Sequence, residues 1–185
     1  MSFSFILSAP LMNIRDSLYQ KWRPVLKHVE RPGRLSGEEN LDLAHIRVVV
    51  FGMGRMGTAA YNAMDPDYEG SIVGVEIDQD KAEEHQAAGR NVVSGDATNP
   101  DFWIRAPELL GGLEWVLLTL PTHRANMSAV MRLKERHYRG RIAATAKYRD
   151  EEEDLKALGV EHTFNIYTEA GLGFANELQT FVGQK

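Results

Sequence analysis

A strand-like segment followed at once by three closely spaced glycines restricts the fold of this chain more than any other feature. Ile46–Phe51 is rich in apolar β-branched residues, as strands buried on both faces of a sheet are. The next six residues, Gly52-Met-Gly-Arg-Met-Gly57, match the pattern G-x-G-x-x-G, and an Ala-containing segment follows. A strand, a glycine turn and a helix in this order are typical of the first unit of a doubly wound α/β sheet.

The rest of the chain alternates between segments with strand and helix patterns. After the first strand, we expect strands at Ser71–Ile77, Asn91–Val93, Trp115–Leu120, Arg141–Ala146 and Glu161–Phe164. We expect helices at Arg55–Met64, Lys81–Ala88, Asp101–Arg105, Arg124–Tyr138, Asp150–Leu158 and Glu169–Val182. This alternation predicts a Rossmann-like, doubly wound sheet of six parallel strands in a three-layer α/β/α arrangement over residues 45–185.

The glycine motif predicts a binding site for phosphate. Gly52 is expected to form the tight turn, Gly54 to let the backbone approach a pyrophosphate, and Gly57 to let helix and strand pack closely. The N–H groups and the dipole at the start of the helix then favour an anion. The alternative, a tight turn without a ligand, is disfavoured by the acidic residue described next.

An acidic residue stands where a dinucleotide-binding fold contacts the ribose. Glu76 ends the second expected strand, nineteen residues after Gly57, and a carboxylate at that place accepts hydrogen bonds from ribose hydroxyls. Because it would repel a 2′-phosphate, it favours NAD or another adenosine nucleotide without that phosphate over NADP. Asp78 lies close by, and ligand contact is weighed equally against a role as N-cap of the next helix.

Two further strand ends are expected on the same edge of the sheet. Gly95-Asp96-Ala97-Thr98 follows the third strand, and Thr119-Leu120 ends the fourth. Since the carboxyl ends of parallel strands line the ligand crevice of such a fold, both segments should lie beside the nucleotide.

The sequence offers no convincing catalytic or metal-binding set. His123, Arg124 and Asn126 begin a helix, and we prefer exposed polar residues there over an anion-binding pair. Lys147 and Tyr148 are adjacent, which does not place both groups at one substrate atom. The six histidines show no metal-ligand spacing. We therefore predict neither catalytic residues nor a metal site.

Residues 1–44 are predicted to be a separate apolar and basic amphipathic segment with a linker. Residues 1–37 have a net charge of +4 and the remainder −9, which argues against nonspecific nucleic-acid binding. The absence of cysteine excludes disulfides and thiolate metal sites. No apolar run reaches the ~18 residues of a membrane span. The apolar start and basic continuation fit a cytoplasmic segment beside a membrane; a helix packed on its own domain is an equal alternative.

Four sequence elements together carry a resemblance to a known family. They are Val48–Gly57, Glu76-Ile77-Asp78, Gly95-Asp96-Ala97-Thr98 and Leu155-x-x-Leu-Gly159-Val. In this arrangement they resemble the TrkA-N domain, also called the KTN or RCK N-terminal domain, which regulates potassium channels and transporters. The resemblance covers about residues 45–182. Phe51–Gly57 and Asp101-Phe-Trp103 are most similar to the cytosolic domain of Kef-type potassium efflux antiporters.

The resemblance implies a ligand, a partner and a set of contact residues. Such domains bind NAD(H), AMP or ATP, form dimers and pass the ligand state to an ion pathway. Carried over by position, the glycines would cradle phosphate beside Arg55, Glu76 would bind ribose, and Asp96 to Thr98 would flank adenine. The expected contacts are Gly52, Met53, Gly54, Arg55, Met56, Gly57, Glu76, Ile77, Asp78, Asp96, Ala97, Thr98, Thr119 and Leu120.

We therefore expect a cytoplasmic nucleotide-sensing domain, not an enzyme, at the inner face of the cell membrane. Its partner would be the membrane domain of a potassium transporter, in the same gene or a separate subunit, and it would form a homodimer. A small NAD-dependent oxidoreductase is the alternative, but no substrate domain follows the nucleotide-binding region. A third possibility is a dimerisation platform without a ligand, which would not require the glycines or Glu76.

Overall fold

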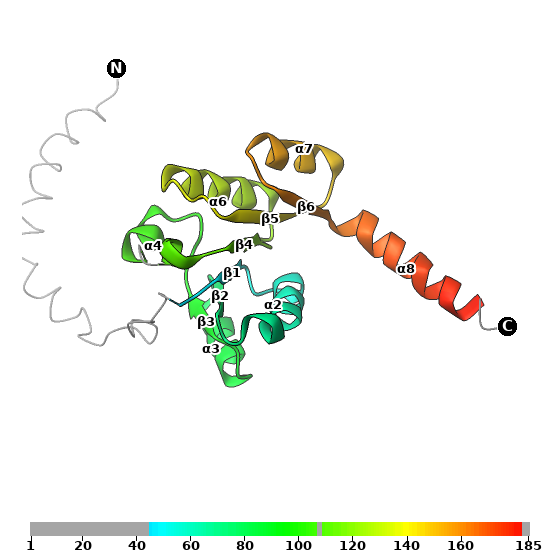
Figure 1. The fold of residues 1–185 in the computed structure, drawn as a ribbon, viewed down its shortest axis with the longest axis horizontal. Helices are drawn as coiled ribbons and strands as arrows, with labels where there is room; N and C mark the ends of the chain where they lie inside the picture. Colours follow the sequence, from blue (N-terminus) through cyan, green and yellow to red (C-terminus); the bar gives the residue numbers. More distant parts are fainter. Residues whose placement is uncertain (1–44, 107–108, 183–185) are drawn as a thin grey trace, which may run out of the picture. The chain divides into compact units, whose positions relative to one another are not determined.

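The computed structural model describes residues 45–106 and 109–182, which form a six-stranded parallel sheet with helices on both faces (Figure 1). The strands are β1 (Val48–Phe51), β2 (Ile72–Glu76), β3 (Val92–Ser94), β4 (Trp115–Leu118), β5 (Arg141–Ala146) and β6 (His162–Asn165). Their order across the sheet is β3-β2-β1-β4-β5-β6, and every neighbouring pair is parallel. From β1 the chain adds β2 and β3 on one side of the sheet, and then β4, β5 and β6 on the other side. This reversal confirms the predicted doubly wound fold.

The helices follow the predicted order with small differences. They are α2 (Arg55–Tyr68), α3 (Gln79–Ala87), α4 (Pro100–Arg105), α5 (Leu109–Gly112), α6 (His123–Glu135), α7 (Arg149–Ala157) and α8 (Ile166–Val182). The short helix α5 was not predicted. Helix α2 continues past the predicted end and contains Pro66, and its last turn is closed by the N–H of Glu69, which donates to the Asp65 carbonyl at 3.1 Å.

The first strand is buried on both sides, as its composition predicts. All four of its residues are at most 1% exposed. Because successive side chains of a strand point to opposite faces, Val48 and Val50 pack with Tyr61 of α2 and Ala82 of α3. This smaller core fixes α2 and α3 over β1–β3.

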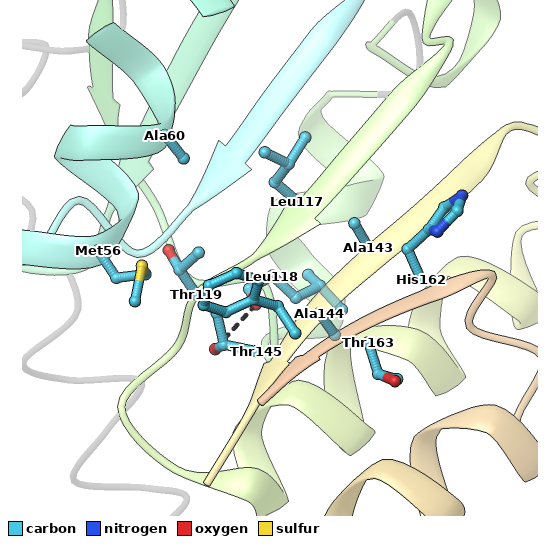
Figure 2. Close-up of a pocket in the computed structure, with 11 residues that line it drawn as sticks. Met56, Ala60, Leu117, Leu118, Thr119, Ala143, Ala144, Thr145, His162 and Thr163 are labelled. Carbon is cyan, nitrogen blue, oxygen red and sulfur yellow. Dashed lines mark hydrogen bonds between the residues drawn. The ribbon is translucent and has the colours of Figure 1, made fainter. Parts of the chain in front are cut away.

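The same face of the sheet is open over β4–β6. A cavity of about 420 Å³ lies there beside α2, and Figure 2 shows Leu117, Ala143 and His162 along it. Its lining is Met56, Ala60, Leu117, Leu118, Thr119, Ala143, Ala144, Thr145, His162, Thr163 and Phe164. In the described part of the chain, this half of the sheet therefore lacks the complete helical layer that covers β1–β3.

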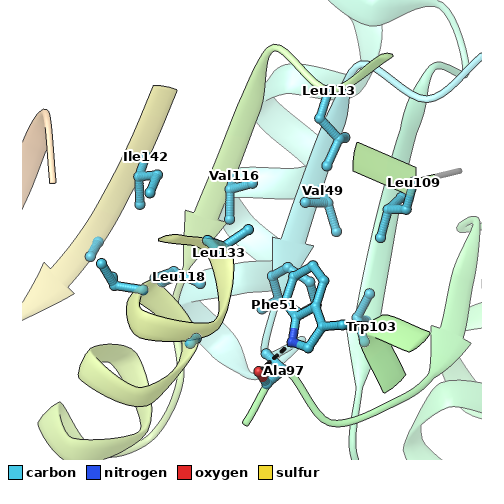
Figure 3. Close-up of a cluster of buried hydrophobic side chains, with 14 of the residues drawn as sticks. Val49, Phe51, Ala97, Trp103, Leu109, Leu113, Val116, Leu118, Leu133 and Ile142 are labelled. Carbon is cyan, nitrogen blue, oxygen red and sulfur yellow. Dashed lines mark hydrogen bonds between the residues drawn. The ribbon is translucent and has the colours of Figure 1, made fainter. Parts of the chain in front are cut away.

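The opposite face carries the larger core, part of which Figure 3 shows. Helices α4, α5, α6 and α7 each contribute buried residues to it. Trp103 is 1% exposed, and its indole N–H donates to the Ala97 carbonyl at 2.8 Å. The rings of Phe51, Phe102 and Trp103 meet at centroid distances of 5.2–5.8 Å, mostly edge to face. This cluster ties α4 to β1 and to the turn after β3, so the core fixes the carboxyl edge of the sheet.

Helix α8 begins directly after β6, three residues earlier than predicted, and projects away from the sheet (Figure 1). Asn165 at the end of β6 accepts a hydrogen bond from the N–H of Thr168 at 3.0 Å. The apolar residues Tyr167, Leu172, Phe174 and Leu178 of α8 are 49–65% exposed. The predictions for residues 1–44 fall outside the described residues.

Candidate functional site: the glycine loop at the carboxyl edge

The three glycines of the loop between β1 and α2 have three different structural roles. Gly52 has φ +90°, and a Cβ on it would lie 2.8 Å from the Thr119 carbonyl oxygen. A Cβ on Gly57 would overlap the Gly52 carbonyl oxygen and lie 2.6 Å from Thr119 Oγ1. A Cβ on Gly54 would meet no atom within 4 Å, and the φ of this residue is −69°. Thus Gly52 and Gly57 close the turn, whereas Gly54 faces open space.

Met53, in the middle of the loop, is fixed by hydrogen bonds to its N–H and carbonyl groups and by the packing of its side chain. Its N–H donates to Oε2 of Glu76 at 2.9 Å. Its carbonyl accepts from Thr58 Oγ1 at 2.9 Å and from His85 Nε2 at 2.8 Å. Its side chain is 2% exposed and packs beneath Gly74, where a Cβ would lie 2.6 Å from the sulfur. Met53 therefore fixes the loop from within the core.

Glu76 lies at the end of β2, directly beneath the loop. Its side chain is buried, with the residue 7% exposed, and its second oxygen accepts from the N–H of Asp78 at 3.2 Å. Each carboxylate oxygen has two lone pairs, so each retains acceptor capacity beyond the one bond described. The neighbouring Ile77 is 68% exposed at the same edge.

Asp78 is the N-cap of α3. Its carboxylate accepts from the backbone N–H groups of Asp80 at 3.1 Å and Lys81 at 3.4 Å, and its other oxygen lies 3.6 Å from the Lys81 ammonium. Of the two roles weighed from the sequence, the structure shows the capping role.

The turn after β3 is closed by its own side chains. Asp96 Oδ1 accepts from both the N–H and the hydroxyl of Thr98, at 2.8 and 2.7 Å. The N–H of Gly95 donates to the Glu76 carbonyl at 2.8 Å, and Ala97 is 2% exposed. The turn is thereby fixed beside the end of β2, as expected from the strand order.

The end of β4 is tied to both neighbouring strands. The Thr119 hydroxyl lies 2.7 Å from the Gly52 carbonyl oxygen and donates into the loop. The N–H of Leu120 donates to Asn126 Oδ1 at 3.2 Å, and the Asn126 amide donates to the Thr145 carbonyl at 2.9 Å. The prediction that Asn126 is an exposed helix-start residue was wrong. It is 2% exposed because it bridges the ends of β4 and β5.

His123 at the start of α6 is also partly buried, with its side chain 23% exposed. Its Nε2 lies 3.2 Å from Asp154 Oδ2 on α7, and its Nδ1 is enclosed without a hydrogen-bond partner. Since the free nitrogen is not accessible, the imidazole is poorly placed to exchange a proton with a ligand.

The predicted contact residues gather along the carboxyl edge of β1–β4. The glycine loop, Glu76, the Asp96 turn and Thr119 are linked directly by hydrogen bonds. Sequence reasoning missed His85 and the bridging role of Asn126, which depend on contacts distant in sequence, and it missed the cavity over β4–β6. Among residues 45–106 and 109–182, no cluster of His, Asp and Glu could hold a metal ion, and no helix is long and apolar enough to cross a membrane.

Comparisons with known proteins agree on family and fold. The family model of the TrkA-N domain matches residues 48–166. The TrkA-N domain of the inner membrane protein ybaL from Escherichia coli is 21% identical, with a TM-score of 0.61; the match covers 71% of this chain and 96% of that one. The AMP-bound Kef CTD from Shewanella denitrificans is 17% identical, with a TM-score of 0.57, covering 74% and 81%.

A third similar structure comes from a protein that is described as exopolyphosphatase-related. It is the NAD(P)-binding domain of an exopolyphosphatase-related protein from Archaeoglobus fulgidus, which is 15% identical with a TM-score of 0.64. The match covers 73% of this chain and 98% of that domain. No functionally curated protein matches the sequence. At these identities the similar structures establish the Rossmann-like fold.

Proposed function

The chain belongs to the TrkA-N domain family, and from this membership and the geometry of the glycine loop we propose that it is a cytosolic nucleotide-sensing domain. It binds NAD(H) or AMP/ATP at the carboxyl edge of β1–β4. The bound nucleotide then regulates a potassium efflux or uptake transporter. Its role is regulatory rather than enzymatic.

The start of α2 is the observation that carries this proposal. The N-cap of helix α2 is Gly54, which has no side chain to cap the helix, and the first turn contains no acidic residue. By contrast, α3, α4 and α6 are capped by Asp78, Asn99 and Thr122. The first N–H groups of a helix have no partner within the helix. At α2 they and the helix dipole are therefore available to a phosphate, next to the open space at Gly54.

The position of Glu76 supports an adenosine ribose next to that phosphate. Its carboxylate lies under the loop and has remaining lone pairs for the ribose hydroxyls. A 2′-phosphate there would bring a second anion against a buried carboxylate, so NAD, AMP and ATP are favoured over NADP. The exposed Ile77 and the turn at Asp96–Thr98 then border the adenine.

A homodimer would cover the two apolar surfaces that the described residues leave open. On α8, Tyr167, Phe174 and Leu178 recur at i, i+7 and i+11, on one face of the helix. The second surface is the cavity over β4–β6. Helix α8 follows β6 without a loop and projects away from the sheet, so it does not cover the cavity of its own chain. We propose that α8 packs into this cavity on a second copy of the chain.

Sedimentation of the full chain tests the dimer. Phe174→Glu places a charge in the apolar stripe and should yield monomers, whereas Asn176→Glu, on the opposite side of α8, should leave the dimer intact. Equal sedimentation of the wild type and both variants as monomers would refute the dimer.

Gating requires that nucleotide affinity differ between two arrangements of the dimer, because only such a difference can shift their equilibrium. A position at the inner face of the membrane, beside the transporter, would pass this difference to the ion pathway. Potassium flux in cells carrying Gly54→Asp on the chromosome tests this step. Flux that no longer responds to nucleotide levels is expected, and an unchanged response would contradict it.

Thermal unfolding with a panel of nucleotides tests the binding itself. A ligand at 100 times its Kd adds about 2.7 kcal/mol to the unfolding free energy, worth several degrees for a domain of this size. We expect NAD, NADH, AMP or ATP to raise Tm and NADP to have a smaller effect. A larger shift with NADP would overturn the role of Glu76. No shift with any nucleotide at millimolar concentration, in protein shown to be nucleotide-free, would overturn the proposal.

A further inference from the structure

Helix α3 forms a hydrogen bond with the glycine loop through the side chain of His85. Its Nε2 lies 2.8 Å from the carbonyl oxygen of Met53, thirty-two residues earlier in the sequence. No sequence motif of the loop includes this residue, and nothing in the proposed nucleotide contacts requires it. The contact is partly buried, and a hydrogen bond is stronger there than in water, so it restrains the Met53 carbonyl.

The surroundings of His85 define which of its nitrogens carries the proton. Its Nδ1 faces a guanidinium nitrogen of Arg90 at 3.4 Å. A guanidinium only donates, so Nδ1 accepts and the proton resides on Nε2, where it is donated to the Met53 carbonyl. Arg90 is itself held by Asn62 of α2, whose Oδ1 accepts from the Arg90 Nε at 2.8 Å. The imidazole is thus oriented from both sides.

Holding the Met53 carbonyl also orients the next amide. In a planar trans peptide the C=O of one residue and the N–H of the next point in opposite directions. With the Met53 oxygen held toward α3 and toward Thr58, the Gly54 N–H points away from α3. Within the described residues it has no hydrogen-bond partner, and the space around Gly54 is open. This N–H is therefore an oriented, unused donor at the start of α2.

We propose that His85 is a positioning residue of the nucleotide-binding loop: from α3, its Nε2–H fixes the Met53–Gly54 peptide so that the Gly54 N–H is aimed at the phosphate. This inference rests on the proposed function for its effect on nucleotide affinity. Its effect on the peptide itself is independent of any ligand. Arg90 and Asn62 act through His85 by holding the tautomer that donates.

Two substitutions at His85 separate the hydrogen bond from the space that the side chain fills. His85→Gln retains an N–H donor near the position of Nε2, whereas His85→Leu has similar bulk and no donor. His85→Met replaces the leucine variant if that one unfolds. His137→Asn is the matched control, since His137 is exposed just past the end of α6 and has a φ of +56°, which Asn tolerates.

The experiment measures two quantities on the full chain of each variant. Calorimetric titration with NAD gives Kd, and the residual dipolar coupling of the Gly54 N–H in the ligand-free protein gives the orientation of that bond. We expect His85→Leu to weaken NAD binding about 3- to 10-fold, the worth of one hydrogen bond, and to change the Gly54 coupling. His85→Gln should restore both to near wild type, and His137→Asn should change neither.

The outcomes distinguish this inference from the proposed function. Suppose that the wild type binds no nucleotide while the Gly54 coupling still changes in His85→Leu and returns to near wild type in His85→Gln. In that case the proposed function fails and the positioning role stands. A wild-type Kd and coupling in His85→Leu would overturn the inference. So would equal losses in His85→Gln and His85→Leu, because they would assign the effect to packing rather than to the donated hydrogen bond.

Discussion

Replacing Gly54 with aspartate should weaken nucleotide binding while leaving the fold intact. Gly54 is the N-cap of α2, with extended backbone angles (φ −69°, ψ −168°) that any residue adopts, and a side chain there meets nothing within 4 Å. Asp is among the best N-cap residues and exceeds Gly by only a few tenths of a kcal/mol. The variant should therefore unfold at the same denaturant concentration as the wild type or slightly above it.

The charge of the new carboxylate sets the size of the effect on binding. Two like charges about 4 Å apart repel by about 1 kcal/mol in bulk water and about 4 kcal/mol near a protein surface of effective dielectric constant 20. For a ligand phosphate at the start of α2, this corresponds to a loss of roughly 5-fold to 1000-fold in affinity. The repulsion should weaken with added salt, because the site is open to solvent.

Gly54→Asn is the control that isolates this charge. Asparagine has the same size and caps a helix as well as aspartate does, so both variants compete equally with the ligand for the first N–H groups of α2. Calorimetric titration of AMP into the two variants, after matching their urea unfolding midpoints, gives the difference. Equal affinity of the aspartate and asparagine variants would refute the placement of a phosphate at this helix end.

The other predictions concern the stability of the glycine loop and of the contacts between α7 and β6. Gly57→Ala should destabilise the domain by about 3 kcal/mol or more, because the added methyl overlaps the Gly52 carbonyl. Gly54→Ala should lower the free energy of unfolding by only about 1 kcal/mol. Urea unfolding measures both values, and equal losses of stability would contradict the geometry of the loop. Hydrogen bonds from Asn165 and Lys156 lower the pKa of Glu152. A carboxyl with a lowered folded-state pKa adds stability above its ordinary pKa that is lost as pH falls through the lowered value. Glu152→Gln should therefore flatten the acid side of the stability profile, and an unchanged profile would show that these bonds contribute nothing.

The order and type of the elements could be predicted because their signals are local. β1 is buried on both faces, so its side chains form an apolar run, and the glycine loop that follows marks the turn into α2. The position of Glu76 at the carboxyl edge could also be predicted, because it ends an expected strand nineteen residues after Gly57. The TrkA-N match over residues 48–166 confirms the family resemblance drawn from these motifs.

The features that could not be predicted depend on contacts between distant segments. Asn126 has the composition of an exposed helix start, and only the meeting of β4 and β5 at its side chain shows why it is buried. His85 lies on a helix of mostly exposed residues, and its contact with Met53 follows from the packing of α3 against the loop. Likewise, no local pattern shows that α8 would leave β6 without a loop.

Titration of isotope-labelled protein with AMP, followed by NMR of the backbone amides, tests the central claim most directly. We predict that the largest chemical shift changes occur in the loop Gly52–Gly57, around Glu76 and in the turn at Asp96–Thr98, and that they saturate with a single Kd. Changes confined to the cavity over β4–β6, or none at millimolar AMP in nucleotide-free protein, would contradict the assignment of the glycine loop as the nucleotide site.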